Sequence, residues 1–301
     1  MKPQFQHEAT TSFSLWLDNY FIKRGEAFSN KAGELFYNED LRIPNYPSDP
    51  NGYVTYSSEY KQWVYNSDVP DAVVPDGVYI DSGDGSKFVQ RGENGLIIDY
   101  DNGRILLSGA YYPSCHDQLK IEADFSVKDF NVYLASETEE TLILENKYNT
   151  NSRSIPDYGK GTGIAPYEPV APAAFISMES TNNSPFAFGG EDLTTLYFRV
   201  VLFAENLYQL DGAMSLCSDA YNLGIRNIGY DHYPLTAFGD VKDGHFSYSE
   251  TVSNCTEHSR IMFIDNVNSS KISDRITNKS NPGLHLGYVD FTVAQSRFPR
   301  H

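Results

Sequence analysis

The sequence predicts an α+β fold that is strand-rich, with mainly antiparallel sheets, an N-terminal amphipathic helix and one or two further helices. Alternating or continuous apolar segments recur along the chain, which is typical of strands. Helical spacing of apolar residues is limited to a few segments. Aromatic residues, which favour strands, make up 14% of the 301 residues. With 40% hydrophobic residues, this length allows one large domain or two ordinary ones.

The first element that we expect is a helix over residues 11–24. Its apolar and aromatic residues follow helical spacing, and Gly25 provides a stop signal. Thr10, Thr11 and Ser12 are candidate N-caps. This aromatic stripe predicts packing against the helix's own domain; docking on a neighbouring subunit is the alternative. The spaced residues are Phe13, Trp16, Leu17, Tyr20 and Phe21.

Residues 42–66 combine Pro and Asn-Gly breaks with many aromatic side chains. A long loop rich in Tyr and Trp is typical of a contact arm, because these residues dominate binding energy at interfaces. We therefore expect partner contacts here. The alternative is a loop folded back on its own core. The candidate contact residues are Tyr53, Tyr56, Tyr60, Trp63 and Tyr65.

The segment DYDNGR, residues 99–104, resembles the start of a calcium loop. A calcium loop of the EF-hand type requires Gly at position six and Glu at position twelve, where this chain has Arg104 and Ala110. Asn102-Gly103 is instead a strong β-hairpin signal, because both residues tolerate positive φ. The sequence therefore predicts a hairpin between strands at 96–100 and 104–107. DSGDGS at 81–86 fails the same calcium test.

Strict alternation predicts a strand over residues 119–127, and a second strand is expected over 130–134. Ser136 and Glu139 form a capping-box pattern for a short helix that ends near 147. Residues 149–172 are rich in Gly, Pro, Ser and Asn, which indicates a linker. Gly159-Lys160-Gly161 within it lacks the Ser or Thr of a phosphate loop. We expect units at 1–148 and 173–301.

The second half has the strongest strand signal of the chain, LTTLYFRVVLFA at 193–204, whose near-continuous apolar character predicts burial on both faces. Asn206 is a candidate N-cap for a helix over 207–221. Further strands are expected over residues 173–179, 245–252, 260–267 and 284–293.

Charge and motifs exclude several function classes. A formal net charge of −17 and the lack of Lys/Arg clusters argue against a sequence-specific nucleic-acid contact. Three cysteines without a CxxC pair predict neither a disulfide scaffold nor a zinc ribbon. We find no nucleophile or metalloprotease motif, and the even spacing of His232, His245 and His258 fits no regular element. We expect no catalytic residues, no cofactor, no metal, no membrane span and no signal peptide.

Six segments together resemble a virion structural protein of marine contractile-tailed bacteriophages, the T-even-like cyanophages and their relatives. They are KPQFQHEATTSFSLWLDNYFIKRGEAFSNK, NGLIIDYDNGRILLSG, FSVKDFNVYLASETEETLILENKY, PAAFISMESTNNSPFAFGGEDLTT, LYQLDGAMSLCSD and GYVDFTVAQSRFPR. This resemblance covers essentially the full chain and contains no catalytic signature.

The resemblance implies a non-enzymatic structural subunit of the virion, assembled in the cytoplasm of the host bacterium. An acidic, strand-rich chain without fibre repeats favours a neck, head–tail connector or tail-terminator ring, with its own copies and other neck or tail proteins as partners. One alternative is a baseplate or receptor- or carbohydrate-binding module on the tail, which would stack sugars on Trp63. A glycan hydrolase with an unrecognised carboxylate pair is the third possibility.

Overall fold

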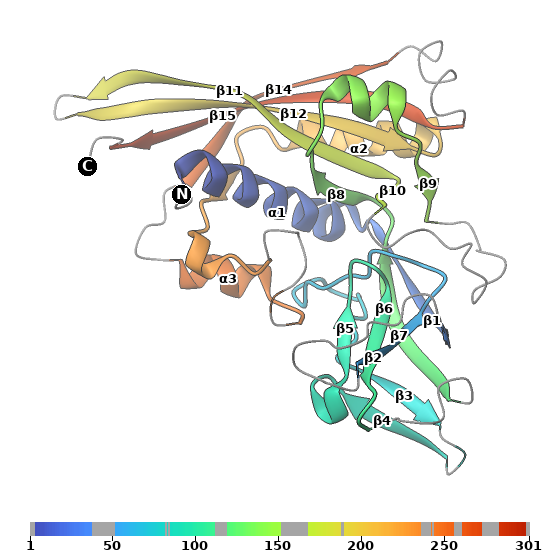
Figure 1. Cartoon of the computed structure of the whole chain (residues 1–301). Coiled ribbons are helices and arrows are strands. Elements are labelled where there is room, and N and C mark those ends of the chain that lie inside the picture. Colours follow the sequence, from blue (N-terminus) through green and yellow to red (C-terminus); the bar gives the residue numbers. More distant parts are fainter. Residues whose placement is uncertain are drawn as a thin grey trace.

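The protein is described by a computed structural model in which two β-sheets are joined by a long N-terminal helix (Figure 1). The structure describes residues 4–37, 52–81, 83, 85–111, 119–151, 168–187, 190–235, 242, 244–255, 261–272 and 283–298. In this part of the chain the fold is strand-rich α+β with mainly antiparallel pairing, as the sequence predicts.

The first sheet has seven strands in the order β4-β3-β7-β1-β2-β6-β5, all antiparallel. Its strands are β1 (Phe28–Tyr37), β2 (Tyr53–Ser57), β3 (Gly77–Asp81), β4 (Ser86–Gln90), β5 (Ile97–Asp99), β6 (Arg104–Ser108) and β7 (Lys120–Lys128). The predicted hairpin at Asn102-Gly103 is confirmed, since β5 and β6 pair across it.

The second sheet has six strands in the order β13-β14-β15-β12-β11-β8, and only the β8–β11 pair within it is parallel. Its strands are β8 (Asn131–Leu134), β11 (Ala173–Ala187), β12 (Glu191–Ala204), β13 (Gly224–Arg226), β14 (Ile261–Lys271) and β15 (His285–Arg297). A small parallel pair, β9 (Asn149–Thr150) and β10 (Val170–Ala171), flanks residues 152–167 of the predicted linker, which lie outside the described residues.

Three α-helices accompany the sheets: α1 (Phe5–Gly25), α2 (Leu207–Asp219) and α3 (Tyr248–Asn254). Short helical turns are η2 (Glu93–Gly95), η3 (Thr141–Glu145) and η4 (Tyr230–His232). Asn206 caps α2 as predicted, because its Oδ1 accepts from the Gln209 N–H at 2.8 Å. At η3 the N-cap position is Glu140, and not the predicted Ser136; Thr138 Oγ1, just before it, accepts from the Thr141 N–H.

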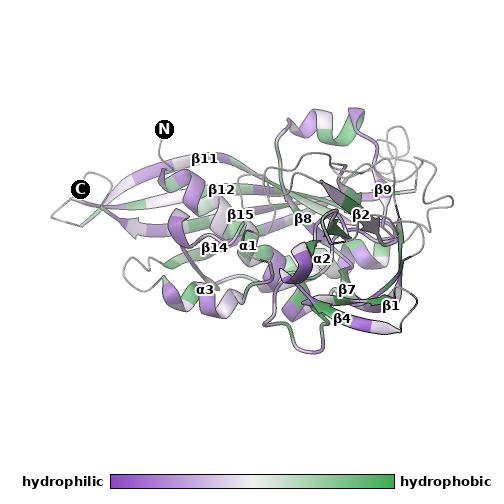
Figure 2. Ribbon diagram, turned by 60° about the horizontal axis from the view of Figure 1, so that its bottom comes forward, coloured by the Kyte–Doolittle hydropathy of each residue, from purple (hydrophilic) through white to green (hydrophobic). Residues whose placement is uncertain are grey.

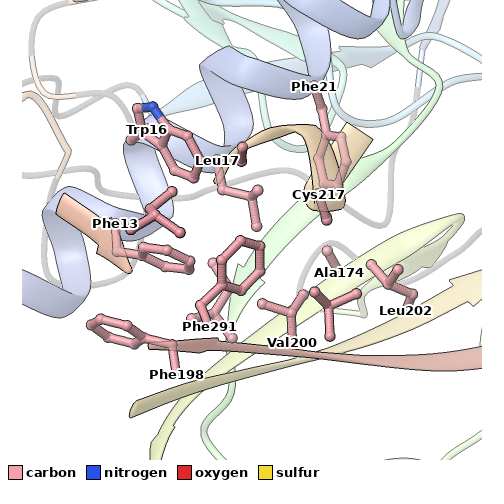
Figure 3. Packing of buried hydrophobic residues seen from close by; sticks show 14 of the residues in the cluster. Phe13, Trp16, Leu17, Phe21, Ala174, Phe198, Val200, Leu202, Cys217 and Phe291 are labelled. Carbon is pink, nitrogen blue, oxygen red and sulfur yellow. The ribbon is translucent and has the colours of Figure 1, made fainter. Parts of the chain in front are cut away.

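Helix α1 packs on the second sheet although it comes first in the chain. Phe13 stacks on Phe198 of β12, with ring centroids 4.4 Å apart, and meets Phe291 of β15 edge-on (Figure 3). On its other sides, Leu15 packs with Ile228 and Ile22 packs with Val64. Because α1 is buried on several sides, apolar residues occur around most of its circumference.

The division between the sheets therefore differs from the predicted units 1–148 and 173–301. The seven strands of the first sheet fall between residues 28 and 128 and lie, in sequence, between two contributors to the second unit, α1 and β8. Strand β8 pairs with β11 across the predicted linker, which places it in the second sheet. The local composition of residues 149–172 predicted a linker there. The boundary between the two sheets is instead determined by long-range strand pairing.

Other expectations at the level of elements also differ from the structure. Helix α1 begins at Phe5 with Gln4 as its N-cap, and not at residue 11 with Thr10, Thr11 or Ser12. Residues 245–252 were expected as a strand but contain the start of α3, because Ser247 caps the helix by accepting from the Glu250 N–H at 3.1 Å. Asp68 adds to this cap by accepting hydrogen bonds from Ser247 and Ser249. Strand β1 was not predicted; its sequence, FSNKAGELFY, has little apolar alternation, and its pairing with β7 fixes it.

A buried ion pair connects α1 to the first sheet. Lys128 Nζ at the end of β7 donates to both carboxylate oxygens of Asp18, at 2.8 and 2.9 Å. The side chains are only 1% and 6% exposed. The Lys128 ammonium also lies 3.8 Å from the centre of the Tyr65 ring. Burial raises the pKa of Tyr65, and the adjacent Asp18 carboxylate raises it further, so the phenol stays neutral beside the pair.

We predict that Asp18→Asn lowers the free energy of unfolding by about 3–5 kcal/mol, because it leaves the Lys128 charge buried without a counter-charge. The double change Asp18→Leu with Lys128→Met should recover most of this loss, since it removes both charges. Urea unfolding of the three proteins measures both effects. Equal losses in the single and double variants would show that the unpaired charge is not the cause.

Candidate assembly surface

The aromatic residues predicted as a contact arm lie inside the first sheet's own core. Tyr53, Tyr56, Trp63 and Tyr65 are buried, and Tyr60 packs partly buried against the same cluster. Trp63 stacks on Phe125 with centroids 4.3 Å apart, and its Nε1 donates to Ser58 Oγ at 3.2 Å. The folded-back alternative describes this segment. While this core is intact, the four buried side chains cannot reach a partner, and Trp63 cannot stack on a sugar.

The Asp99 hairpin is held by its own hydrogen bonds. The Asp99 carboxylate accepts from Asn102 Nδ2 at 2.9 Å and from Arg104 Nε at 2.7 Å. Gly103 has φ +60° and approaches the Tyr60 carbonyl so closely that a Cβ would lie 1.8 Å from its oxygen. A glycine is therefore required at this position by both backbone conformation and space.

Lys61 is the buried titratable side chain that most resembles a chemical site. Burial lowers its pKa to about 8, and a lysine with such a pKa is a common feature of enzyme sites. Its Nζ, however, donates to the Glu168 carbonyl at 2.8 Å. The Asn151 side chain both accepts from the Lys61 N–H and donates to its carbonyl. These bonds hold residues 151 and 168 against the first sheet, which is a structural role.

The second sheet presents a polar face that the helices do not cover. Strands β11, β12 and β15 extend beyond the N-terminal end of α1 in Figure 1, and the projecting end of β11 is mainly hydrophilic in Figure 2. We define the open face as the side chains of this region that alternate with those facing α1 and α2. They are Ser180, Asn182, Ser184, Leu193, Thr195, Tyr197, Ile261, Phe263, Asn266, Asn268, Thr292, Ala294 and Ser296, so the face is mainly polar except around Ile261 and Phe263.

Charges on the open side of the sheet are few and are paired where they meet. Arg199 donates to both carboxylate oxygens of Asp290, at 2.7 and 3.2 Å, and to Glu139 at 3.2 Å. The Tyr288 ring lies beside the guanidinium, 5.4 Å away. Arg199 bridges these two carboxylates, and this cluster separates the open face from the part of the sheet that η3 and Tyr148 cover.

Three groups of large exposed apolar side chains lie on the two sheets. Phe186, near the tip of the β11–β12 hairpin, is 62% exposed. At the opposite edge of the second sheet, exposed residues at β13 and β14 form what we call the apolar patch: Tyr221, Leu223, Ile261 and Phe263. Ile261 and Phe263 of this patch lie on the open face, since Phe263 pairs with Ala294. On the first sheet, Tyr79 and Phe88 pair edge-on across β3 and β4 and are 44% and 53% exposed. None of these residues was predicted as a contact residue, because exposure of an aromatic side chain depends on pairing that is not local.

The sequence matches no known protein family and no curated protein. Among the residues that the structure describes, no group of three or more His, Cys, Asp or Glu side chains is placed to hold a metal ion. None of the described helices has the length and apolar character that a membrane span requires.

We predict that Trp63→Ala costs about 3–5 kcal/mol of unfolding free energy, as expected for truncating a large buried aromatic side chain. Tyr208→Ala, at a side chain that is 90% exposed, is the matched control and should stay within about 0.5 kcal/mol. Denaturant unfolding gives both values. A small effect of Trp63→Ala would contradict the placement of this segment in the core.

We also predict that wild-type stability rises relative to Lys61→Met as the pH increases from 8 to 10.5. Below pH 8 both folded and unfolded Lys61 are protonated and the burial cost is fully present; between pH 8 and 10.5 the folded state loses its proton first, which relieves that cost. The gain approaches about 3 kcal/mol at 1.36 kcal/mol per pKa unit. Urea unfolding across this range tests it, with the exposed Lys87→Met as control. Parallel pH curves for wild type and Lys61→Met would contradict it.

Proposed function

We propose that this protein is a non-enzymatic structural subunit of a bacteriophage particle, and that it forms a ring at the neck or the end of the tail. The observation that carries this proposal is the second sheet. Its long strands project beyond the helices with a mainly polar face, and on both sides of the sheet the described strands leave segments of β11 and β14 unpaired. A ring requires two different, mutually complementary surfaces on every subunit, and a sheet open on both sides provides them.

Two sequence properties support the same conclusion. The resemblance to virion structural proteins covers essentially the full chain. The net charge of −17 would repel DNA phosphates, so that packaged DNA could pass a ring of such subunits without adhering. The partners that we propose are copies of the same chain and other neck or tail proteins. Its place is then the virion, after assembly in the cytoplasm of the host bacterium.

One observation favours the second candidate, a baseplate or carbohydrate-binding module on the tail. The exposed pair of Tyr79 and Phe88 on the β3–β4 hairpin offers aromatic surface of the kind on which sugars stack. This pair, and not the buried Trp63, is where a glycan would bind.

We predict that the purified chain assembles into a closed ring and that the oligomeric fraction grows with salt, because salt screens the repulsion between acidic subunits. Native mass spectrometry and sedimentation at low and high NaCl measure this assembly. Electron microscopy of intact particles should then place a fixed set of copies at the head–tail junction or at an end of the tail tube. Monomers or trimers on the distal tail, with glycan binding that Phe88→Ala abolishes, would establish the second candidate instead.

A further inference from the structure

The outermost strands of the second sheet, β8 and β13, are short. Each covers only part of the long strand beside it, β11 or β14. Strand β8 pairs with residues 173–176 of β11, and no described strand pairs with residues 177–187 on that side. Strand β13 pairs with residues 261–263 of β14, and Leu223 bonds to Ile264; no described strand pairs with residues 265–271. We call these segments the β11 edge and the β14 edge. Most of their residues are exposed.

The two edges run in opposite directions within the same sheet. Strand β14 is antiparallel to β15, β15 is antiparallel to β12, and β12 is antiparallel to β11. A second copy placed beside the first in the same orientation therefore meets it with antiparallel edges. Antiparallel pairing needs no change of either strand, and the seven residues of the β14 edge are a usual strand length.

The short outer strands leave complementary steps. Strand β8 covers the end of β11 near Ala204 of β12, whereas β13 covers β14 nearer to the hairpin tip. We consider a neighbouring copy that is displaced along the strands, toward the end of the sheet near Ala204. Its β11 edge then lies along the β14 edge, in the space that the short β13 leaves free. Its β8 lies beyond Lys271, past the end of β14. In this position Phe186 of the neighbour approaches the apolar patch, so two exposed apolar sites become buried together.

We propose that copies of this chain assemble by pairing the β11 edge of one subunit with the β14 edge of the next. This inference rests on the proposed ring function and specifies its interface. Backbone hydrogen bonds between the edges supply affinity, as in other cases of strand addition, and contact of Phe186 with the apolar patch fixes the register.

Alternation of side chains restricts the pairing to three registers. The open face of one copy must continue into the open face of the next, because a shift by one residue would turn polar side chains toward the core. Asn268 then lies opposite Ser180, Asn182 or Ser184 of the neighbour. The register opposite Ser184 keeps residues 184–187 clear of β13, whereas the register opposite Ser180 brings them against it. Opposite Asn182, the neighbour is displaced by four residues, since Asn182 is level with Thr195 and Asn268 is level with Arg199.

This displacement has the slope of a closed barrel. At ~3.3 Å per residue, four residues advance roughly 13 Å along the strands, and the four long strands of each copy span roughly 19 Å across them at ~4.8 Å per strand. The resulting inclination of about 35° lies within the range of strand tilts that close barrels. In every copy, α1 and α2 cover one face of the second sheet and would lie on the outside of the barrel. The open face would then line the lumen.

Disulfide cross-linking tests the pairing in the full chain. Three double variants in a Cys115→Ser background combine Asn268→Cys with Ser180→Cys, Asn182→Cys or Ser184→Cys; Cys217 and Cys255 are buried. Directly opposite Cβ atoms lie about 4.5–5.5 Å apart, near disulfide range, whereas diagonal ones are too distant. We expect one double variant to form a ladder of covalent multimers on oxidation, while the four single variants remain monomeric on denaturing gels.

The single variants and the native mass separate the other outcomes. Disulfide dimers of Asn268→Cys or Asn182→Cys alone would overturn the proposal, because they require two identical edges to pair. Rings that form without cross-links in any double variant would overturn the edge pairing but leave the ring function intact. A covalent ladder on open filaments would support the pairing and contradict the ring. Monomers at every concentration would overturn the pairing.

Discussion

The arrangement of the two sheets depends on the contact between Asp18 of α1 and Lys128 of β7. Desolvating a lysine and a carboxylate is costly, and the cost is offset here by two charge-assisted hydrogen bonds and by the Tyr65 ring beneath the ammonium. The pair is polar and directional, so it specifies one position of α1 against the first sheet, which apolar packing of Ile22 against Val64 alone would define less sharply.

This contact also gives α1 a second function beyond covering the second sheet. Phe13 and Phe198 hold α1 against β12 of the second sheet, and the ion pair holds the same helix against β7 of the first sheet. The two contacts together fix the position of one sheet relative to the other. Asn66 strengthens the joint, since it donates to Asn19 of α1 and accepts from the Tyr248 N–H at the start of α3. The projecting part of the second sheet is therefore carried on a base with several independent polar connections.

The sequence predicts elements well where local pattern and burial agree. The hairpin at Asn102-Gly103, the strand of residues 119–127, the strand of 193–204 and the capped helix after Asn206 are all confirmed. The predicted burial of the 193–204 strand on both faces holds only for residues 200–204. It fails where distant partners decide. Trp63 is buried by Phe125, 62 residues further along the chain, and nothing within the local sequence distinguishes such a core aromatic from a contact aromatic. The candidate surface was not predicted for the same reason. The predicted strand ends at residue 179, because STNNSPFA at 180–187 has no apolar alternation, and pairing with β12 fixes the extended form of these residues.

Open strand edges on an otherwise folded chain need an explanation, because they template uncontrolled pairing. Here β11 carries Pro185 and an irregularity at Glu179, and β14 carries an irregularity at Asp265. Such features limit pairing to a few registers. A dimer of two identical edges would bury one edge of each copy and leave the other exposed. Pairing of unlike edges around a closed ring leaves none, so closure resolves the hazard that the two edges create.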